Sequence, residues 1–179
     1  MSDRTTNGLK ACISSLDNIV SPSAAASGDA LAREQVTLLS KYLKFLVQRV
    51  DLTRDRTRFE LALYCRQGRR VGEALAEADT PDGQLSALVA EGERLLASAP
   101  ARTQELESSI ARLRMTISRI VRRLGGTDTE LRHTVDDAVR ETTRGMIDLQ
   151  RSWFAPQAWE ADPESIPALE GLLAAIPSS

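Results

Sequence analysis

The sequence predicts an all-α fold, an up-and-down helical bundle of five to six helices built around one unusually long second helix. Three observations lead to this prediction. Leu, Ala, Arg and Glu, which all favour helix, dominate the 179 residues. Apolar side chains recur at spacings of three and four almost without interruption from Ala32 to Leu75. No segment shows the alternation that is typical of a half-buried strand.

The long second helix is expected to follow Asp29, whose side chain can cap it, and to run to about Ala78. At 1.5 Å per residue its apolar stripe would span about 65 Å. The helix is either continuous or broken once near Gly68. Between Val50 and Leu61 the spacing becomes three, four, four, a stutter that should locally unwind a supercoil. The predicted stripe consists of Ala32, Val36, Leu39, Leu43, Leu46, Val50, Thr53, Thr57, Leu61, Tyr64, Gly68, Val71 and Leu75.

Shorter helices are predicted on either side of this one. Residues 1–6 are expected to fray, and Leu9 to Val20 forms a first short helix. Residues 21–28 are small and include a proline, which predicts a linker. The third helix starts at Thr80-Pro81-Asp82 and runs to about residue 98. Its inward side chains are Leu85, Leu88, Gly92 and Leu95.

The fourth helix has the cleanest stripe and ends at two glycines, which favour the left-handed C-terminal cap. The fifth helix begins at a capping box of Thr127 and Glu130. Residues 152–179 form an aromatic hinge and a short helix that packs on the bundle, and the whole chain, residues 1–179, is expected to be one domain. The two stripes are Thr103, Leu106, Ile110, Leu113, Ile117, Ile120 and Leu124, then Leu131, Val135, Ala138, Thr142, Gly145 and Leu149.

Charge is segregated along the chain although the net charge is only −2. Residues 41–70 hold nine basic and three acidic groups, and residues 71–111 hold two basic and eight acidic groups. Residues 112–123 then hold five arginines and no acid. We expect these blocks to pair neighbouring helices rather than to form a basic surface for nucleic acid or phosphate, since charge runs are usually solvated helix faces.

Cysteine content and hydropathy indicate the compartment. Cys12 and Cys65 each lie within a helical pattern, so we expect two small buried hydrophobes rather than a disulfide. No apolar segment is long enough to span a membrane, and the N-terminus has no signal-peptide pattern. The expected location is the cytoplasm, without membrane or nucleic-acid partners.

A polar layer interrupts the stripe of the long helix. It consists of Arg49, Thr53, Arg56, Thr57 and Glu60, which fall on the face that is apolar before and after them. Because unpaired buried charge is very costly, these groups need partners. Three solutions are open: acids of the fifth helix, an anionic or polar ligand held in a cavity, or a partner subunit. The candidate acids are Asp136, Asp137, Glu141 and Asp148.

Signals for catalysis or metal binding are weak. The chain has one histidine, His133, and Glu130 and His133 have the Glu-x-x-His spacing of di-iron bundles. Such sites need this pair twice, so we predict no metal and no cofactor. Phosphate-loop, dinucleotide and nucleophile-elbow motifs do not occur. We therefore expect a protein that is not an enzyme.

Two functional hypotheses follow. The first is a non-catalytic interaction or scaffolding protein, self-associating through the long helix or binding a protein partner. The alternative is a bundle that binds a small anion at the polar layer, and an accessory subunit or enzyme of an unfamiliar helical class is a third, weaker option. The tail residues Trp153, Phe154 and Trp159 are a second candidate site. They either fold back onto the bundle, which we favour, or serve as a helix-in-groove ligand.

Overall fold

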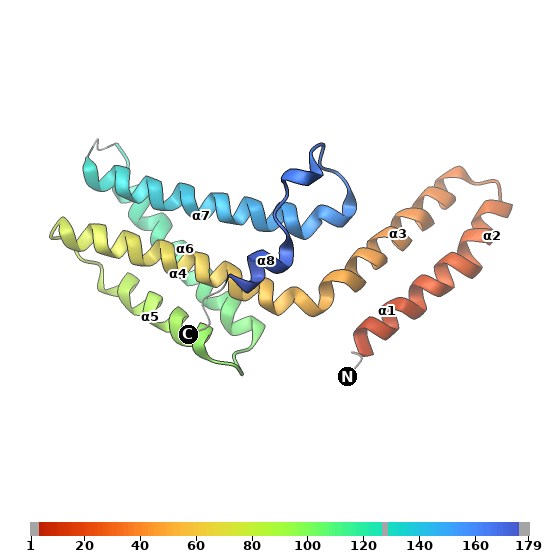
Figure 1. Cartoon of the computed structure of the whole chain (residues 1–179), viewed down its shortest axis with the longest axis horizontal. Coiled ribbons are helices and arrows are strands. Elements are labelled where there is room, and N and C mark those ends of the chain that lie inside the picture. The colour runs from red at the N-terminus through yellow and green to blue at the C-terminus, as the bar shows by residue number, and fades with distance from the viewer. Residues whose placement is uncertain (1–3, 127–128, 176–179) are drawn as a thin grey trace. The chain divides into compact units, whose positions relative to one another are not determined.

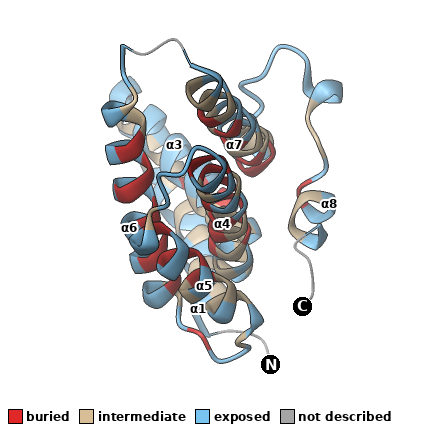
Figure 2. Ribbon diagram, turned by 90° about the vertical axis from the view of Figure 1, so that its left-hand side faces the viewer, coloured by how far each residue is buried: buried red, intermediate tan, exposed pale blue. Residues whose placement is uncertain are grey.

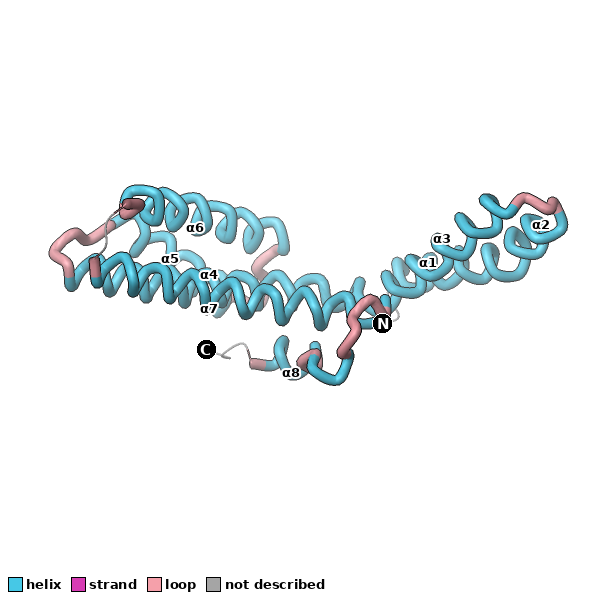
Figure 3. The backbone as a smooth tube through the Cα atoms, turned by 90° about the horizontal axis from the view of Figure 1, so that it is seen from above, coloured by secondary structure: helices cyan, strands magenta, loops and turns pink. Residues whose placement is uncertain are grey.

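The computed structural model describes residues 4–126 and 129–175, and every regular element in these ranges is a helix (Figure 3). The predicted all-α fold is confirmed. The chain divides into two compact units, Met1–Thr53 and Arg54–Ser179, which we call the N-terminal and C-terminal units. One domain over residues 1–179 stays a prediction.

The N-terminal unit is a helical hairpin (Figure 1). Its first arm runs through α1, a π-helical turn and α2, and it packs along the second arm, α3. Gly28 turns the chain between the arms at a φ of 74°, a conformation that favours glycine. As predicted, the Asp29 side chain caps α3 by accepting hydrogen bonds from the backbone of Leu31 and Ala32. The helix bounds are α1 Arg4–Ser15, π-turn Leu16–Val20, α2 Ser21–Ala26 and α3 Ala30–Arg49.

The predicted linker over residues 21–28 is wrong, because its first six residues form α2. Pro22 interrupts an ordinary α-helix, since it lacks an N–H and its ring meets the carbonyl four residues earlier. Here the wider π-helical turn Leu16–Val20 directly precedes it, and a wider turn relieves that contact. Only the end of the predicted linker, around Gly28, lies outside a helix.

The N-terminal unit has a shallow core. Ser40 and Phe45 are the only buried residues among those described in its helices. Of the predicted stripe, Ala32, Val36 and Leu43 are half-buried. Leu39 is 52% exposed and Thr53 is also exposed, so the stripe is wrong at these two positions.

The helical backbone continues from Ala30 to Glu77, which confirms one unusually long second helix. Its second part is α4, Thr53–Glu77, and a single 3-10 turn, Val50–Leu52, precedes it. This turn lies where the spacing of apolar residues begins to stutter. Gly68 lies inside α4, so the helix is not broken there.

In the C-terminal unit, α4, α5, α6 and α7 follow one another up and down (Figure 1), and α8 packs against α7. Figure 2 shows their buried residues as strips along α4, α6 and α7. The inward faces predicted from the sequence are buried or half-buried throughout the described part of this unit. The bounds are α5 Gly83–Ala97, α6 Thr103–Arg123, α7 Glu130–Phe154 and α8 Leu169–Ala174. The fully buried core side chains include Leu61, Val71, Leu75, Leu85, Leu106, Leu113, Val135 and Leu149.

Two glycines allow α4 and α5 to approach closely. A Cβ atom on Gly92 of α5 would lie 2.5 Å from Sγ of Cys65. A Cβ atom on Gly68 of α4 would lie 2.7 Å from the Val89 side chain. These distances are shorter than any ordinary van der Waals contact, so each position requires the smallest residue.

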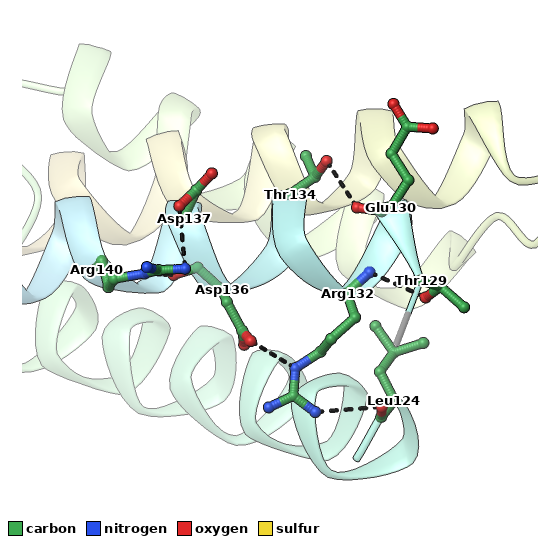
Figure 4. Close-up of polar contacts among 8 residues, drawn as sticks. All are labelled: Leu124, Thr129, Glu130, Arg132, Thr134, Asp136, Asp137 and Arg140. Carbon is green, nitrogen blue, oxygen red and sulfur yellow. Dashed lines mark hydrogen bonds and ion pairs between the residues drawn. The ribbon is translucent and has the colours of Figure 1, made fainter. Parts of the chain in front are cut away.

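Several helix ends differ from the prediction. Asp82, not Thr80, caps α5, and its carboxylate accepts a hydrogen bond from the Leu85 backbone. Thr129 caps α7, so Glu130 is the first helical residue and not the third residue of a capping box (Figure 4). Thr127 lies outside the described residues. The tail hinge also starts later, because Trp153 and Phe154 belong to α7.

Candidate functional site

The predicted polar layer is distributed over both units. Arg49 and Thr53 belong to the N-terminal unit, where the Thr53 hydroxyl donates to the Arg49 carbonyl at 3.4 Å. Arg56, Thr57 and Glu60 lie on the first turns of α4 in the C-terminal unit. The structure therefore brings together three of the five residues within one compact unit.

Within α4, the charge of Arg56 is balanced locally. Its Nε lies 3.1 Å from a carboxylate oxygen of Glu60, one helical turn away. Its guanidinium also stacks over the Trp153 ring of α7, with 4.6 Å between the guanidinium carbon and the ring centroid. Arg56 thus gains an ion pair and a cation–π contact while most of its side chain is covered.

Within the described residues of the C-terminal unit, the acids of α7 do not pair with Arg56, although acids of the fifth helix were one of the three expected solutions. Asp136 and Asp137 each pair within α7, with Arg132 at 2.7 Å and Arg140 at 3.1 Å (Figure 4). Glu141 instead reaches across to α4 and pairs with Arg66 and Arg70. Asp148 has no ion pair in the described part of the chain.

Other cross-helix ion pairs follow the charge blocks. The acidic α5 pairs with the basic α6 through Glu91 and Arg112 at 2.6 Å, and Glu93 pairs with Arg69 of α4. Asp82 at the start of α5 meets Arg119 at 3.5 Å. This is the helix pairing that the alternating blocks predict. The arginine of each pair is exposed, so each pair contributes about 1 kcal/mol or less to stability.

A groove with a volume of about 720 Å³ lies between α4, α6 and α7 in the C-terminal unit. Arg56 and Glu60 line it, and so do residues that the sequence analysis did not select. The most unusual is Gln67, which is 5% exposed and whose Oε1 is buried without a hydrogen-bond partner. Such an unsatisfied amide costs about 1–3 kcal/mol. The other polar lining residues are Arg114, Ser118, Arg122, Thr142, Thr143 and Gln150.

An apolar strip on α3 of the N-terminal unit is open to solvent. Leu31 is 65% exposed, Leu38 51% and Tyr42 53%. With Gln35 they follow a spacing of four, three and four, so all four residues share one side of the helix. We call these four residues the α3 outer face. Leu39 lies beside this face and is also half-exposed.

The tail folds back on α7, which is the alternative that the sequence analysis favours. The Ser152 hydroxyl donates to the Pro167 carbonyl at 2.7 Å, and Leu169 of α8 is buried. Trp153 is buried, whereas Trp159 is 76% exposed and its ring stacks with Phe154 at a centroid distance of 6.1 Å. Of the three predicted tail residues, Trp153 is therefore buried, Phe154 is half-buried and Trp159 is exposed.

The two thiols differ in their surroundings. Cys65 is buried as predicted, and burial raises its pKa to about 12. Cys12 is exposed, so the prediction of a buried hydrophobe is wrong there. His133 is exposed on α7, and the described residues contain no group of three His, Cys, Asp or Glu placed to hold a metal ion. None of the described helices has the length and apolar character needed to cross a membrane.

Comparison with known proteins returned nothing: no family model, no curated protein and no solved structure matches this chain. Function is therefore inferred from two features of the structure, the α3 outer face and the groove between α4, α6 and α7.

Proposed function

We propose that this chain is a non-catalytic interaction protein that self-associates through the α3 outer face. The observation that carries the proposal is the exposure of three large apolar side chains, Leu31, Leu38 and Tyr42, in one strip on one helix. Exposed apolar patches of this kind are typical of protein–protein contacts. A scaffolding role is the simplest use of such an assembly.

The shallow core of the N-terminal unit favours burial of its exposed apolar strip against a partner. A hairpin whose described helices bury only Ser40 and Phe45 gains little from the hydrophobic effect. If a second copy of the hairpin packs on the outer face, the two hairpins form a four-helix assembly. Each copy then covers the apolar strip of the other. Burying the exposed half of each leucine contributes about 1 kcal/mol, and a symmetric dimer counts every contact twice.

The charges beside the strip favour a second copy as the occupant. In heptad notation the outer-face residues take the a and d positions, which places both Glu34 and Lys41 at g. In an antiparallel pair the g positions of the two helices face each other. Glu34 of one protomer then meets Lys41 of its partner, and the reverse pair forms by symmetry. Both side chains are exposed and have no ion pair within the described residues.

The first experiment is the molar mass of the full chain by light scattering, compared with a Leu38→Glu variant. We expect the native chain to be a dimer. Leu38→Glu places a charge at the centre of the strip in both chains of the dimer, and this should weaken dimerisation by about 3 kcal/mol or more. Met115→Glu is the matched control, because Met115 is 71% exposed on α6 and lies outside the strip. A native chain that stays monomeric, or a Leu38→Glu variant that dimerises like the control, contradicts the proposal.

A charge exchange tests the antiparallel arrangement. Glu34→Lys and Lys41→Glu should each replace attraction with repulsion at two sites and weaken the dimer about five- to thirtyfold. The double variant should restore it, since the exchanged charges again face each other. If the double variant dimerises more weakly than both single variants, the antiparallel register is contradicted. The Leu38→Glu variant tests a separate point, namely whether the α3 outer face is the interface at all.

The compartment that this proposal implies is reducing, such as the cytoplasm. Cys12 and Cys65 are both free thiols, and Cys12 is exposed. An exposed thiol persists in a reducing compartment and is prone to oxidation elsewhere. The net charge of −2 gives the chain no general attraction to nucleic acid or to an anionic membrane, so a protein partner fits best.

A further inference from the structure

We propose that the groove between α4, α6 and α7 binds a small organic anion with an apolar body, of the class of alkyl or aryl carboxylates and phosphates. All of its lining residues lie in the C-terminal unit, so this proposal is independent of self-association through α3. Its volume, about 720 Å³, is within the range of about 300–1,000 Å³ that small-molecule sites occupy.

The charges of the groove favour an anion. Arg56, Arg114 and Arg122 line it, and Glu60 is the only acid among its lining residues. Glu60 is already paired with Arg56. Two guanidinium groups therefore remain in excess, and guanidinium forks bind carboxylate and phosphate in a bidentate manner.

The arginines of α6 differ according to the side on which they lie. Arg112 pairs with Glu91 of α5, and Arg119 pairs with Asp82, which caps α5. Arg114 has no ion pair in the described part of the chain, and Arg122 donates only to the Ser118 carbonyl of its own helix. Arg114 and Arg122, the α6 arginines that line the groove, thus have no acid partner among the described residues, as binding of an external anion requires. Arg123 has no acid partner among them either, but it does not line the groove.

Gln67 is the second, independent observation. Its side chain is almost completely buried, it lines the groove, and its Oε1 has no hydrogen-bond partner. Nearly all buried polar groups in folded proteins are paired, so an unpaired amide at a groove requires an explanation. Because an anionic head group accepts hydrogen bonds, the Gln67 amide would rotate so that its Nε2–H group faces the groove and donates to the ligand.

Apolar and aromatic side chains form part of the lining beside the polar ones, and they favour a ligand with an apolar body over a bare inorganic ion. One side comes from Ile117 and Val121 of α6, and the facing side comes from Val139 and Met146 of α7. Tyr64 of α4 completes the wall. An alkyl or aryl group can displace water from these surfaces, whereas phosphate alone would leave them wet.

The test is calorimetric titration of the full chain with decanoate, decyl phosphate, decyltrimethylammonium and inorganic phosphate, all below micelle formation. We expect saturable binding of decanoate or decyl phosphate, and the tighter of the two identifies the head group. In a Trp159→Phe background, Trp153 is the only tryptophan. Its fluorescence should change when the ligand binds, because Arg56 stacks on its ring. No binding of either anion overturns the proposal. If decyltrimethylammonium binds as tightly as the anions, the groove does not select an anionic head group. If inorganic phosphate binds as tightly, the groove does not require an apolar body.

Variants locate the ligand. Arg114→Gln and Gln67→Met should each weaken binding about fivefold or more, because each removes a polar contact to the head group. Arg123→Gln is the matched control, since Arg123 is an exposed arginine of α6 that does not line the groove. Circular dichroism checks that each variant remains folded. If Arg114→Gln and Arg123→Gln bind alike, the site is not this groove.

Discussion

At the scale of single residues, the closest packing lies between Cys65 and Gly92. The sulfur atom occupies the space that a Cβ atom on Gly92 would need, and Leu61 fills the adjoining space. Sequence alone places both residues on helices but cannot pair them, because the contact joins positions that are far apart in the chain. Gln67 was missed for a similar reason: its burial depends on α6 and α7, and no local pattern signals it.

The thiols should react at very different rates. At about pH 8, a disulfide reagent should modify one thiol per chain quickly, and this is Cys12, which is exposed. Cys65 should react only after unfolding, because burial raises its pKa to about 12 and blocks access. Since that pKa lies above the unfolded value, stability from the neutral thiol is complete below about pH 9 and is lost as the pH rises toward 12. Rapid reaction of both thiols in the native protein would contradict this packing.

Gly92→Ala should destabilise the C-terminal unit by about 1–3 kcal/mol, because the new methyl group collides with the Cys65 sulfur. Gly72→Ala is the matched control, since a Cβ at Gly72 would meet nothing within 4 Å. That control should gain about 0.5–1 kcal/mol from reduced backbone entropy in the unfolded chain. Thermal unfolding measures both, and an equal response of the two variants would show that α4 and α5 are not this close.

At the scale of elements, the sequence predicts the interior helices well and their ends less well. The stripe of α6 is regular from Leu106 to Ile120, and all of its predicted positions in that interval are buried. Asp82 and Thr80 are both capable caps, and only the geometry of the turn selects Asp82. In α3, apolar residues occur on more than one side. The first arm of the hairpin packs along only one of these sides, which leaves Leu39 exposed.

The folded-back tail gives a prediction about α8. Leu169→Ala should lower stability by about 2–3 kcal/mol, because its side chain is buried where α8 packs on α7. Trp159→Ala should cost about 1 kcal/mol or less, since it loses only a stacking contact with Phe154. Thermal unfolding of both variants makes the comparison. A larger loss from Trp159→Ala than from Leu169→Ala would contradict the docked tail.

At the scale of the whole molecule, composition and periodicity predict the all-α class, and charge blocks predict which helices pair. Function is less predictable, because both candidate sites arise from the assembled structure. The outer face becomes a site only because α3 keeps one side open, and the groove combines Gln67, Arg114 and Thr142 from three helices. The predicted polar layer falls partly into that groove, through Arg56 and Glu60.

The most direct test of the central claim, self-association through α3, is the molar mass of the native chain by light scattering over a range of micromolar concentrations. Self-association predicts a mass that approaches twice the 19.6 kDa of one chain as the concentration rises. It also predicts that Leu38→Glu remains near the single-chain mass throughout. A native chain that stays at the single-chain mass across the range would contradict self-association through α3.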